Sequence, residues 1–301
     1  MDFQQLRYFV TVADEASFSR AAARLGVAQP SLSQQMKKLE AEVGRPLLDR
    51  LPPRVVPTQA GERLLTRARQ FLAAVADARR QMGESDGAVA GPLVVGAIPT
   101  IAPFVLPRVL RAMSAAHPAV QLRVVEDVTA RLVEMVERGE LDVAVLSGVD
   151  GARTLHAEKL AEEPLRLLVP ADHRLARRRR RSASWADLER ERFLVLHEMH
   201  CLSGQVSRVC ERVRLRPPVV MRGAHLFTIA AMVSAGLGVS VVPHLMAEGD
   251  FTAGRCAYVR FAKDPPKRDI TAAWSLLRYR TNAARAFVDL LRAELRRSIP
   301  G

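Results

Sequence analysis

The chain has 301 residues and a formal charge of +13, from 45 lysines and arginines against 32 aspartates and glutamates. This length predicts two domains. The excess of positive charge favours binding to a polyanion such as nucleic acid, although an arginine-rich chain of any function would share it. No apolar run approaches the ~18–20 residues of a membrane span, and no secretory signal is evident, so we expect a cytoplasmic protein without a membrane partner. Three cysteines in a chain of this length do not make a disulfide scaffold.

Residues 17–39 carry the pattern of two short helices joined by a tight turn. The apolar spacing predicts a first helix from Phe18 to Leu25, and Gly26 can then adopt the left-handed conformation that such a turn requires. Pro30 suits the first turn of a second helix, where its missing N–H costs nothing. The residues predicted to form the buried face of this second helix are Leu32, Met36 and Leu39.

The opposite face of the second helix is polar and cationic, which is typical of a recognition helix that lies in a DNA major groove. Downstream, Arg45, Arg50 and Arg54 surround a Pro-Pro turn and Val55-Val56 forms a short strand pattern. This segment predicts a β-wing whose arginines contact phosphates or enter the minor groove. An ordinary helical hairpin of an enzyme is the alternative interpretation, but it does not account for the wing. The residues expected to contact double-stranded DNA are Gln29, Pro30, Ser31, Ser33, Gln34, Lys37, Arg50 and Arg54.

The next segment predicts one long helix over residues 59–84 that contains no proline. Its apolar positions follow one another at steps of four and three, the heptad spacing of a coiled coil: Leu64, Ala68, Phe71, Val75, Ala78 and Met82. We expect this helix to pair two chains, so that two helix-turn-helix units read neighbouring grooves. The alternative is a single amphipathic helix packed on its own domain. Gly83, Gly87 and Gly91, with Ser85 and Asp86 between them, end the pattern and predict an interdomain hinge.

From residue 92 the pattern changes to short strands that alternate with helices. The strand patterns are LVVGAIP, VQLRVVED, LDVAVLS, RLLVP, RFLVLH, PPVVMRG, GVSVVP and ITAAWSLL, and the expected helices lie at 102–116, 132–137, around Val206, at 227–235 and at 283–295. This alternation predicts parallel sheets covered by helices. Ligands of such folds bind at the carboxyl ends of strands, where Thr100 and Thr129 are expected to face a cleft. Each hydroxyl equally suits a helix cap, and the two roles are compatible.

Two cysteines lie close together after the RFLVLH strand. His200 and Cys201 stand where a new helix begins, and Cys210 follows nine positions later. A helix N-terminus and a neighbouring imidazole stabilise a thiolate, which attacks peroxide, and a second cysteine converts the resulting sulfenic acid to a disulfide. The alternative is that both cysteines are inert apolar packing. Cys256 has no partner in this pattern and is expected to pack in a strand.

Other candidate sites have weaker patterns. His197 and His200 could ligate a metal together with Cys201, but no further ligands follow at the usual spacing, so we expect neither metal nor cofactor. The run from Arg177 to Arg181 is expected to be a solvated loop. No Gly-rich phosphate loop or catalytic triad motif is present.

The first 61 residues resemble the winged helix-turn-helix of the LysR-type transcriptional regulators. The motif A-A-x-x-L-x-V-x-Q-P-x-L-S-x-Q-x-K-x-L-E is followed by G-x-x-L-x-x-R and T-x-A-G at fixed spacing. The later strand–helix sets resemble the two-lobed, periplasmic-binding-protein-like α/β effector domain of this family. The boundaries that we predict are 1–58 for the winged helix-turn-helix, 59–86 for the dimerising linker helix, 87–91 for the hinge and 92–301 for the effector domain, with lobe I at 92–163 and 268–301 and lobe II at 164–267.

Nearly the whole chain is similar to the OxyR branch of this family, which senses hydrogen peroxide. The resemblance implies that Cys201 is oxidised, that Cys210 traps it as a disulfide, and that Arg268 faces the thiolate. The remaining residues that it implies for a peroxide pocket are Thr100, Thr129, His200 and Gln205. This sequence differs from the branch at Ser203-Gly204, where an acidic residue usually helps to move a proton to the leaving hydroxide, so the reaction rate is left open.

We therefore expect a DNA-binding transcriptional regulator, not an enzyme, that is switched by thiol oxidation. It should act as a dimer of dimers on promoter DNA and work with RNA polymerase. A regulator of the same architecture that binds a small organic effector in the cleft, with inert cysteines, is the first alternative. A thiol peroxidase is the second, and the helix-turn-helix argues against it.

Overall fold

The computed structural model describes residues 1–51, 54–83, 87–148, 154–178, 182–249, 251–262 and 265–299. Two compact units make up the chain. The first contains Met1–Ser85 with the short segments Glu137–Glu140 and Leu277–Tyr279, and the second contains Asp86–Val136, Leu141–Leu276 and Arg280–Gly301.

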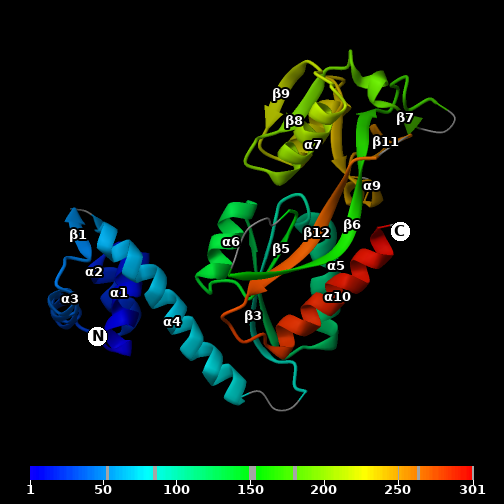
Figure 1. Cartoon of the computed structure of the whole chain (residues 1–301). Helices are drawn as coiled ribbons and strands as arrows, with labels where there is room; N and C mark the ends of the chain where they lie inside the picture. Colours follow the sequence, from blue (N-terminus) through cyan, green and yellow to red (C-terminus); the bar gives the residue numbers. More distant parts are fainter. Residues whose placement is uncertain are drawn as a thin grey trace. The chain divides into compact units, whose positions relative to one another are not determined.

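The first unit begins with three helices, α1 (Phe3–Glu15), α2 (Phe18–Leu25) and α3 (Gln29–Val43) (Figure 1). Gly26 ends α2 with a positive φ of 68°, and Pro30 lies in the first turn of α3. The α3 residues with the predicted apolar spacing are buried together with Phe9 of α1. The structure thus confirms both helices and the turn between them.

The wing and the linker helix complete this unit. Strand β1 (Leu48–Leu51) pairs antiparallel with β2 (Arg54–Pro57), whereas Pro52 and Pro53 of the predicted turn lie outside the described residues. Helix α4 spans Gln59–Gly83. Leu65 and Ala68 are buried in this unit, whereas Phe71 is 49% exposed and Met82 is 89% exposed. The first turns of α4 therefore pack within their own unit, and its later apolar residues remain largely uncovered.

The second unit opens with parallel strands. The elements in chain order are β3 (Gly91–Ala97), α5 (Ala102–Ala116), β4 (Val120–Glu126), α6 (Thr129–Glu137) and β5 (Val143–Leu146). Strand β3 lies between β4 and β5 and pairs parallel with both. Gly87 and Gly91 both have positive φ angles at the predicted hinge, whereas Ser85 and Asp86 lie outside the described residues.

Two long strands connect the lobes of this unit, and they correct the prediction of purely parallel sheets. Strand β6 (Leu155–Pro170) pairs antiparallel with β12 (Lys267–Ser275), and β12 also pairs antiparallel with β5 (Figure 1). The prediction was wrong because the chain returns from the second lobe beside the strand by which it entered. Only the last five residues of β6 were predicted, since its first part is mostly polar and partly exposed.

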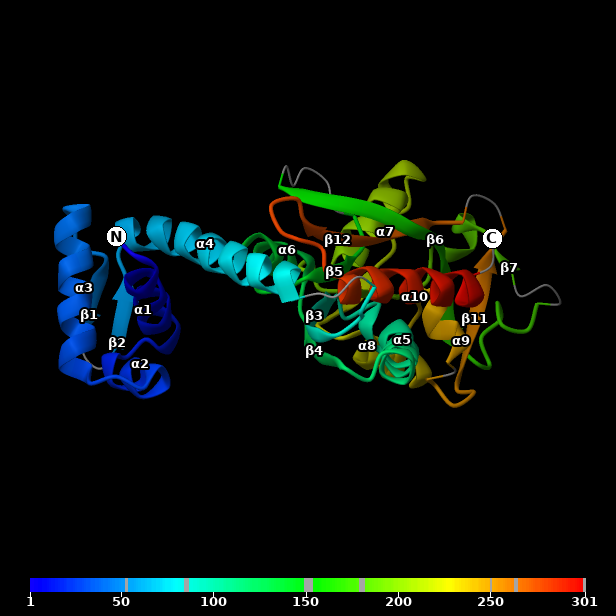
Figure 2. The same ribbon diagram turned by 90° about the horizontal axis from the view of Figure 1, so that it is seen from below.

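The second lobe is built on the far half of β6. Its elements are β7 (Ser182–Ala183), a 3-10 turn (Trp185–Leu188), β8 (Phe193–Leu196), α7 (Cys201–Arg212), β9 (Val219–Gly223), α8 (Leu226–Ser234), β10 (Ser240–Pro243), α9 (His244–Glu248) and β11 (Cys256–Phe261). Strands β10 and β11 pair antiparallel with β6, and β8 pairs parallel with β9. The chain then returns through β12 to α10 (Asn282–Ser298), which packs against α5 in the first lobe (Figure 2).

Candidate functional site

The predicted DNA-contacting face is open on the first unit. The six residues Gln29, Pro30, Ser31, Gln34, Lys37 and Lys38 of α3 are exposed, on the face opposite the buried Leu32 and Leu39. Ser33 is only half-buried, at the flank of this face. A helix that exposes amide, hydroxyl and ammonium groups can donate to and accept from base edges in a major groove.

The wing is fixed to the helices beside it. The Arg50 guanidinium lies 4.8 Å from the centre of the Phe18 ring, and the backbone N–H of Val55 donates to the Ala16 carbonyl at 3.0 Å. Arg50 and Arg54 are both exposed. The wing arginines therefore stand on a supported hairpin where they are free to reach phosphates.

Helix α7 carries both cysteines of interest. Cys201 is its first residue, His200 is its N-cap, and Cys210 lies on the same helix two residues before its end. Both thiols are free and half-buried, and both side chains pack against the hydrophobic core. Nine residues of helix separate them by about 13 Å along the axis. Since a disulfide requires Cα atoms within about 7 Å, the two sulfurs are held apart by the helix itself.

The two thiols differ in their surroundings. Burial, with a smaller contribution from the Glu211 carboxylate, raises the pKa of the Cys210 thiol above its ordinary value. Cys201 instead occupies the helix N-terminus, where the partial positive charge of the helix favours a thiolate. The position of Cys201 suits the attacking sulfur, and that of Cys210 suits the second sulfur.

The predicted neighbour His200 is held by the backbone. Its side chain is 7% exposed, and its Nε2 atom donates a hydrogen bond to the Ala224 carbonyl at 2.7 Å. This bond fixes the imidazole beside the first turn of α7. Within the described residues, no hydrogen bond reaches the Cys201 sulfur, so His200 and Cys201 are adjacent without being bonded.

Arg268 and Thr100 are in contact in a fully buried cluster. The Arg268 guanidinium donates to the Thr100 hydroxyl at 2.7 Å and to the Thr100 carbonyl at 2.8 Å. It also forms an ion pair with Glu163 at 2.7 Å, and neither of these two charged side chains is exposed. The second oxygen of Glu163, Oε1, accepts from the backbone N–H of Leu245 at 2.7 Å. The cluster joins β3, β6, β12 and the start of α9.

Glu163 was missed by the sequence analysis. It lies in a polar part of β6 and looks like a surface residue in the sequence. Only the strand register, which places Glu163 opposite Arg268, shows that the two charges pair. The Glu-Glu-Pro sequence at this point carries no local signal of burial.

Gln205 and Thr129 lie where the lobes face each other. The Gln205 amide nitrogen on α7 donates to the Ser147 hydroxyl at 2.9 Å, which follows β5 in the first lobe. Its carbonyl oxygen Oε1 and the Thr129 hydroxyl oxygen are buried without a hydrogen-bond partner among the described residues. Buried polar atoms without partners are uncommon, and they are the groups that a small polar ligand satisfies. Ser147 also went unpredicted, since it ends an apolar strand without any motif.

The predicted pocket thus forms two connected pairs, Arg268 with Thr100 and Gln205 with Ser147, while Thr129 remains unpaired. The expected contact of Arg268 with Cys201 is not among the hydrogen bonds and ion pairs of the described residues, because Glu163 and Thr100 occupy the guanidinium. Cys256 is buried in β11, as expected of strand packing. Of the arginine run, Arg178 pairs with Asp187 at 2.6 Å, whereas residues 179–181 lie outside the described residues.

Two further features of the described residues bear on the kind of protein. Within those ranges, no group of three or more His, Cys, Asp or Glu side chains is placed to hold a metal ion. None of the described helices combines the length and apolar character needed to cross a membrane.

The chain matches two protein-family models. Residues 3–62 match the bacterial regulatory helix-turn-helix proteins of the LysR family, and residues 86–296 match the LysR substrate binding domain. The chain belongs to the LysR family. This LysR-family protein is therefore a DNA-binding transcriptional regulator, with a winged helix-turn-helix followed by a two-lobed effector domain.

Relatives of this LysR-family chain are similar to it over most of their length. The hydrogen peroxide-inducible genes activator of Dickeya chrysanthemi is 33% identical over 274 residues, which cover 91% of this chain and 89% of that protein. The DNA-binding transcriptional dual regulator OxyR of Escherichia coli K12 is 32% identical over 270 residues, covering 90% and 88%.

Solved structures give the same picture. A full-length OxyR cysteine variant from Pseudomonas aeruginosa has a TM-score of 0.85 and 31% identity, covering 100% of this chain and 98% of that one. A hydrogen peroxide-bound OxyR cysteine mutant of Corynebacterium glutamicum has a TM-score of 0.66 and 30% identity, covering 99% and 95%. The resemblance expected from the sequence motifs is confirmed.

Proposed function

We propose that this protein is a transcriptional regulator that senses hydrogen peroxide through Cys201. The observation that carries the proposal is the placement of two free thiols on one helix, the first at its N-terminus and the second beyond disulfide reach. The named relatives, which include hydrogen peroxide-inducible genes activators, support the same function.

The chemistry proceeds in two balanced steps. The Cys201 thiolate attacks one oxygen of hydrogen peroxide, the O–O bond breaks, and the departing hydroxide takes a proton to leave as water. Cys201 is then a sulfenic acid. The Cys210 thiol, on losing its proton, attacks the Cys201 sulfur and expels a second water molecule, so that a disulfide forms and peroxide has been reduced to two waters.

The second step requires a conformational change. Helix α7 must unwind between the cysteines before their sulfurs can meet, because it holds them about 13 Å apart along its axis. Unwinding would remove Gln205 from Ser147 and so release a hydrogen bond between the lobes. A covalent change at one sulfur would in this way alter the packing of the effector domain.

The pocket residues have distinct proposed parts. Thr129 and the Gln205 carbonyl oxygen, both buried without partners, are placed to hydrogen-bond a small polar molecule such as peroxide. Arg268 positions Thr100 through two hydrogen bonds. His200, held by Ala224, supports the first turn of α7. Ser203-Gly204 supply no carboxylate, so proton transfer to the leaving hydroxide falls to the remaining hydroxyl groups and solvent.

The output of this switch is DNA binding. The exposed face of α3 reads base edges in the major groove, and Arg50 and Arg54 of the wing contact the backbone or the minor groove. Pairing of α4 helices and of effector domains would form a dimer of dimers, which reads two half-sites. RNA polymerase is the further partner of such a regulator on promoter DNA.

Thiol counting after stoichiometric peroxide tests the sensing step. Intact-mass measurement should show the loss of two free thiols in the wild-type protein and in Cys256→Ser, which removes the buried cysteine of β11 as a matched control. Cys210→Ser should stop at the sulfenic acid, and Cys201→Ser should not react at this dose.

DNA footprints distinguish the other two functions. A Cys201→Ser protein that still changes its footprint with peroxide would overturn peroxide sensing through this thiol and leave control by an organic effector in the inter-lobe cleft. Repeated peroxide turnover with a thiol reductant, at a rate unaffected by DNA, would instead indicate a thiol peroxidase.

A further inference from the structure

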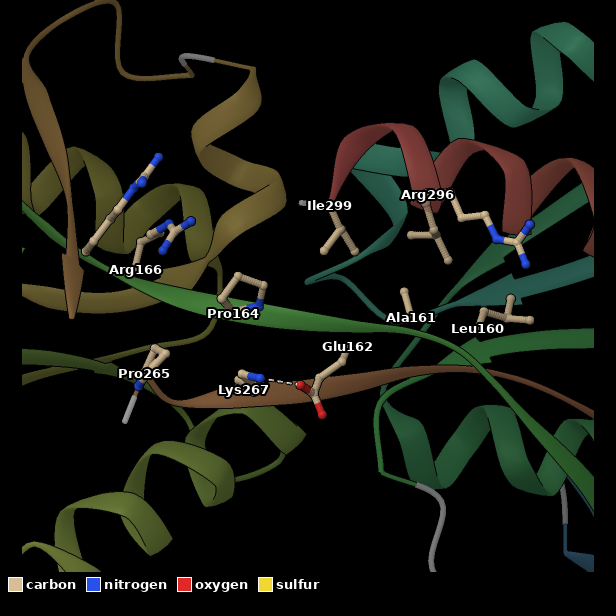
Figure 3. Close-up of a pocket in the computed structure, with 11 residues that line it drawn as sticks. Leu160, Ala161, Glu162, Pro164, Arg166, Pro265, Lys267, Arg296 and Ile299 are labelled. Atoms are coloured by element: carbon tan, nitrogen blue, oxygen red, sulfur yellow. Dashed lines mark hydrogen bonds and ion pairs between the residues drawn. The ribbon is translucent and has the colours of Figure 1, made fainter. Parts of the chain in front are cut away.

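A second cavity lies beside the strands that connect the two lobes. Its volume is about 520 Å³, in the range of small-molecule sites. Residues of β6, β11, β12 and α10 line it, so both lobes contribute to its wall. In Figure 3, Arg166 lies toward one end and Arg296 toward the other, with Pro164 of β6 between them.

Its wall carries an excess of positive charge. Arg166, Arg260 and Arg296 line the cavity, and none of them has a carboxylate within ion-pair distance among the described residues. Lys267 is different, because Glu162 neutralises it at 2.6 Å. Three guanidinium groups around one hollow, without matching carboxylates, repel one another and favour an anion.

Arg166 is the most constrained of the three. It is 8% exposed, and its Nε atom donates to Nδ1 of His244 at 3.3 Å. Burial, and then the charge of Arg260, lower the pKa of Arg166 below its ordinary value, and burial together with Arg166 lowers that of His244. His244 is thus a neutral acceptor, and the guanidinium charge is left uncompensated.

The remainder of the lining is apolar. Leu160, Leu295 and Ile299 stand beside the cations, together with two prolines. A bare inorganic anion would leave this surface unused, whereas an organic anion would cover it. Arginine also pairs with a carboxylate through two parallel hydrogen bonds, which suits a planar acid.

We propose that this cavity binds a small organic carboxylate with an apolar body. It lies apart from the inter-lobe cleft that holds Thr129 and Gln205. Successive strand residues point to opposite faces, so Glu162 borders the cavity while the neighbouring Glu163 is buried against Arg268. A ligand that spans Arg260 of one lobe and Arg296 of the other would hold the lobes at one angle and act on the regulator independently of its thiols.

Isothermal titration calorimetry of the reduced full-length protein with sodium benzoate tests the proposal. Benzoate should bind once per chain, and its neutral analogue benzamide should not. Arg260→Ala and Arg296→Ala should each weaken binding about tenfold or more, since each removes a charge-assisted hydrogen bond. Arg297→Ala is the matched control, because Arg297 is the exposed neighbour on α10 that pairs with Glu294 and does not line the cavity.

The contrary outcomes are equally defined. No benzoate binding at millimolar concentrations, or binding that Arg260→Ala and Arg296→Ala leave unchanged, overturns the proposal. Inorganic phosphate that binds as tightly as benzoate also overturns it, since the apolar wall would then contribute nothing. Cys201→Ser should bind benzoate like the wild type, so failure of this site and failure of peroxide sensing are separate results.

Discussion

The ion pair between Glu163 and Arg268 offers the sharpest test of how the effector domain is held together. Glu163→Gln removes the negative charge but keeps the shape of the side chain. Arg268 would then be a buried cation whose remaining partners are neutral, the hydroxyl and carbonyl of Thr100. The variant tests whether this charge pair stabilises the junction of β3, β6, β12 and α9.

The size of the effect follows from burial. Neither side chain of the pair is exposed, and the two charged atoms are 2.7 Å apart. Removal of one partner from such a pair costs about 3–5 kcal/mol. The amide oxygen of glutamine can still accept one hydrogen bond, so we expect about 3 kcal/mol. With a urea m-value of about 3 kcal/mol/M, the unfolding midpoint should fall by about 1 M.

Tryptophan fluorescence during urea unfolding measures this loss in the relevant unit. The chain has two tryptophans, Trp185 and Trp274, and both belong to the second unit. Glu162→Gln is the matched control, because Glu162 is the adjacent residue but pairs with Lys267 at the exposed surface. Solvent screens that pair, so its removal should matter far less. If the two variants shift the midpoint equally, the buried pair is not a stabilising element and our account of this junction is wrong.

Three other outcomes follow from the structure. Gln34→Ala should flatten sequence preference by about 1–3 kcal/mol per contacted base pair in a binding-shift assay, whereas Arg54→Ala should weaken all sites and lower the salt dependence; unchanged operator selectivity of Gln34→Ala would show that another face reads DNA. Phe71→Asp, at a position 49% exposed in the single chain, should lower the oligomer mass in light scattering because it buries an unpaired charge in the proposed seam, and an unchanged mass would remove the coiled coil. In the Cys201→Ser protein, iodoacetamide should modify Cys210 slowly at neutral pH and faster only as the pH rises past that of an ordinary thiol, since burial raises the pKa of Cys210 and the thiolate is the reactive form; a rate equal to that of a free cysteine would contradict this.

Local patterns in the sequence determined the elements that depend on neighbouring residues. Gly26 and Pro30 defined the turn and the start of α3, because left-handed backbone and a missing N–H are properties of single residues. The bounds of α5 could be predicted from apolar spacing alone. The nine-residue separation of Cys201 and Cys210 likewise placed both thiols on one helix before their surroundings were known.

Tertiary structure decided what depends on residues far apart in the chain. Strand β12 pairs antiparallel with β6 because the chain re-enters the first lobe beside its exit, and no local pattern specifies that register. The partner of Arg268 is Glu163, 105 positions away, and that of Gln205 is Ser147, 58 positions away. A polar residue in a strand has the same local sequence whether it meets water or a buried countercharge. Only the folded arrangement determines which of the two it meets, and with it the site's charge and shape.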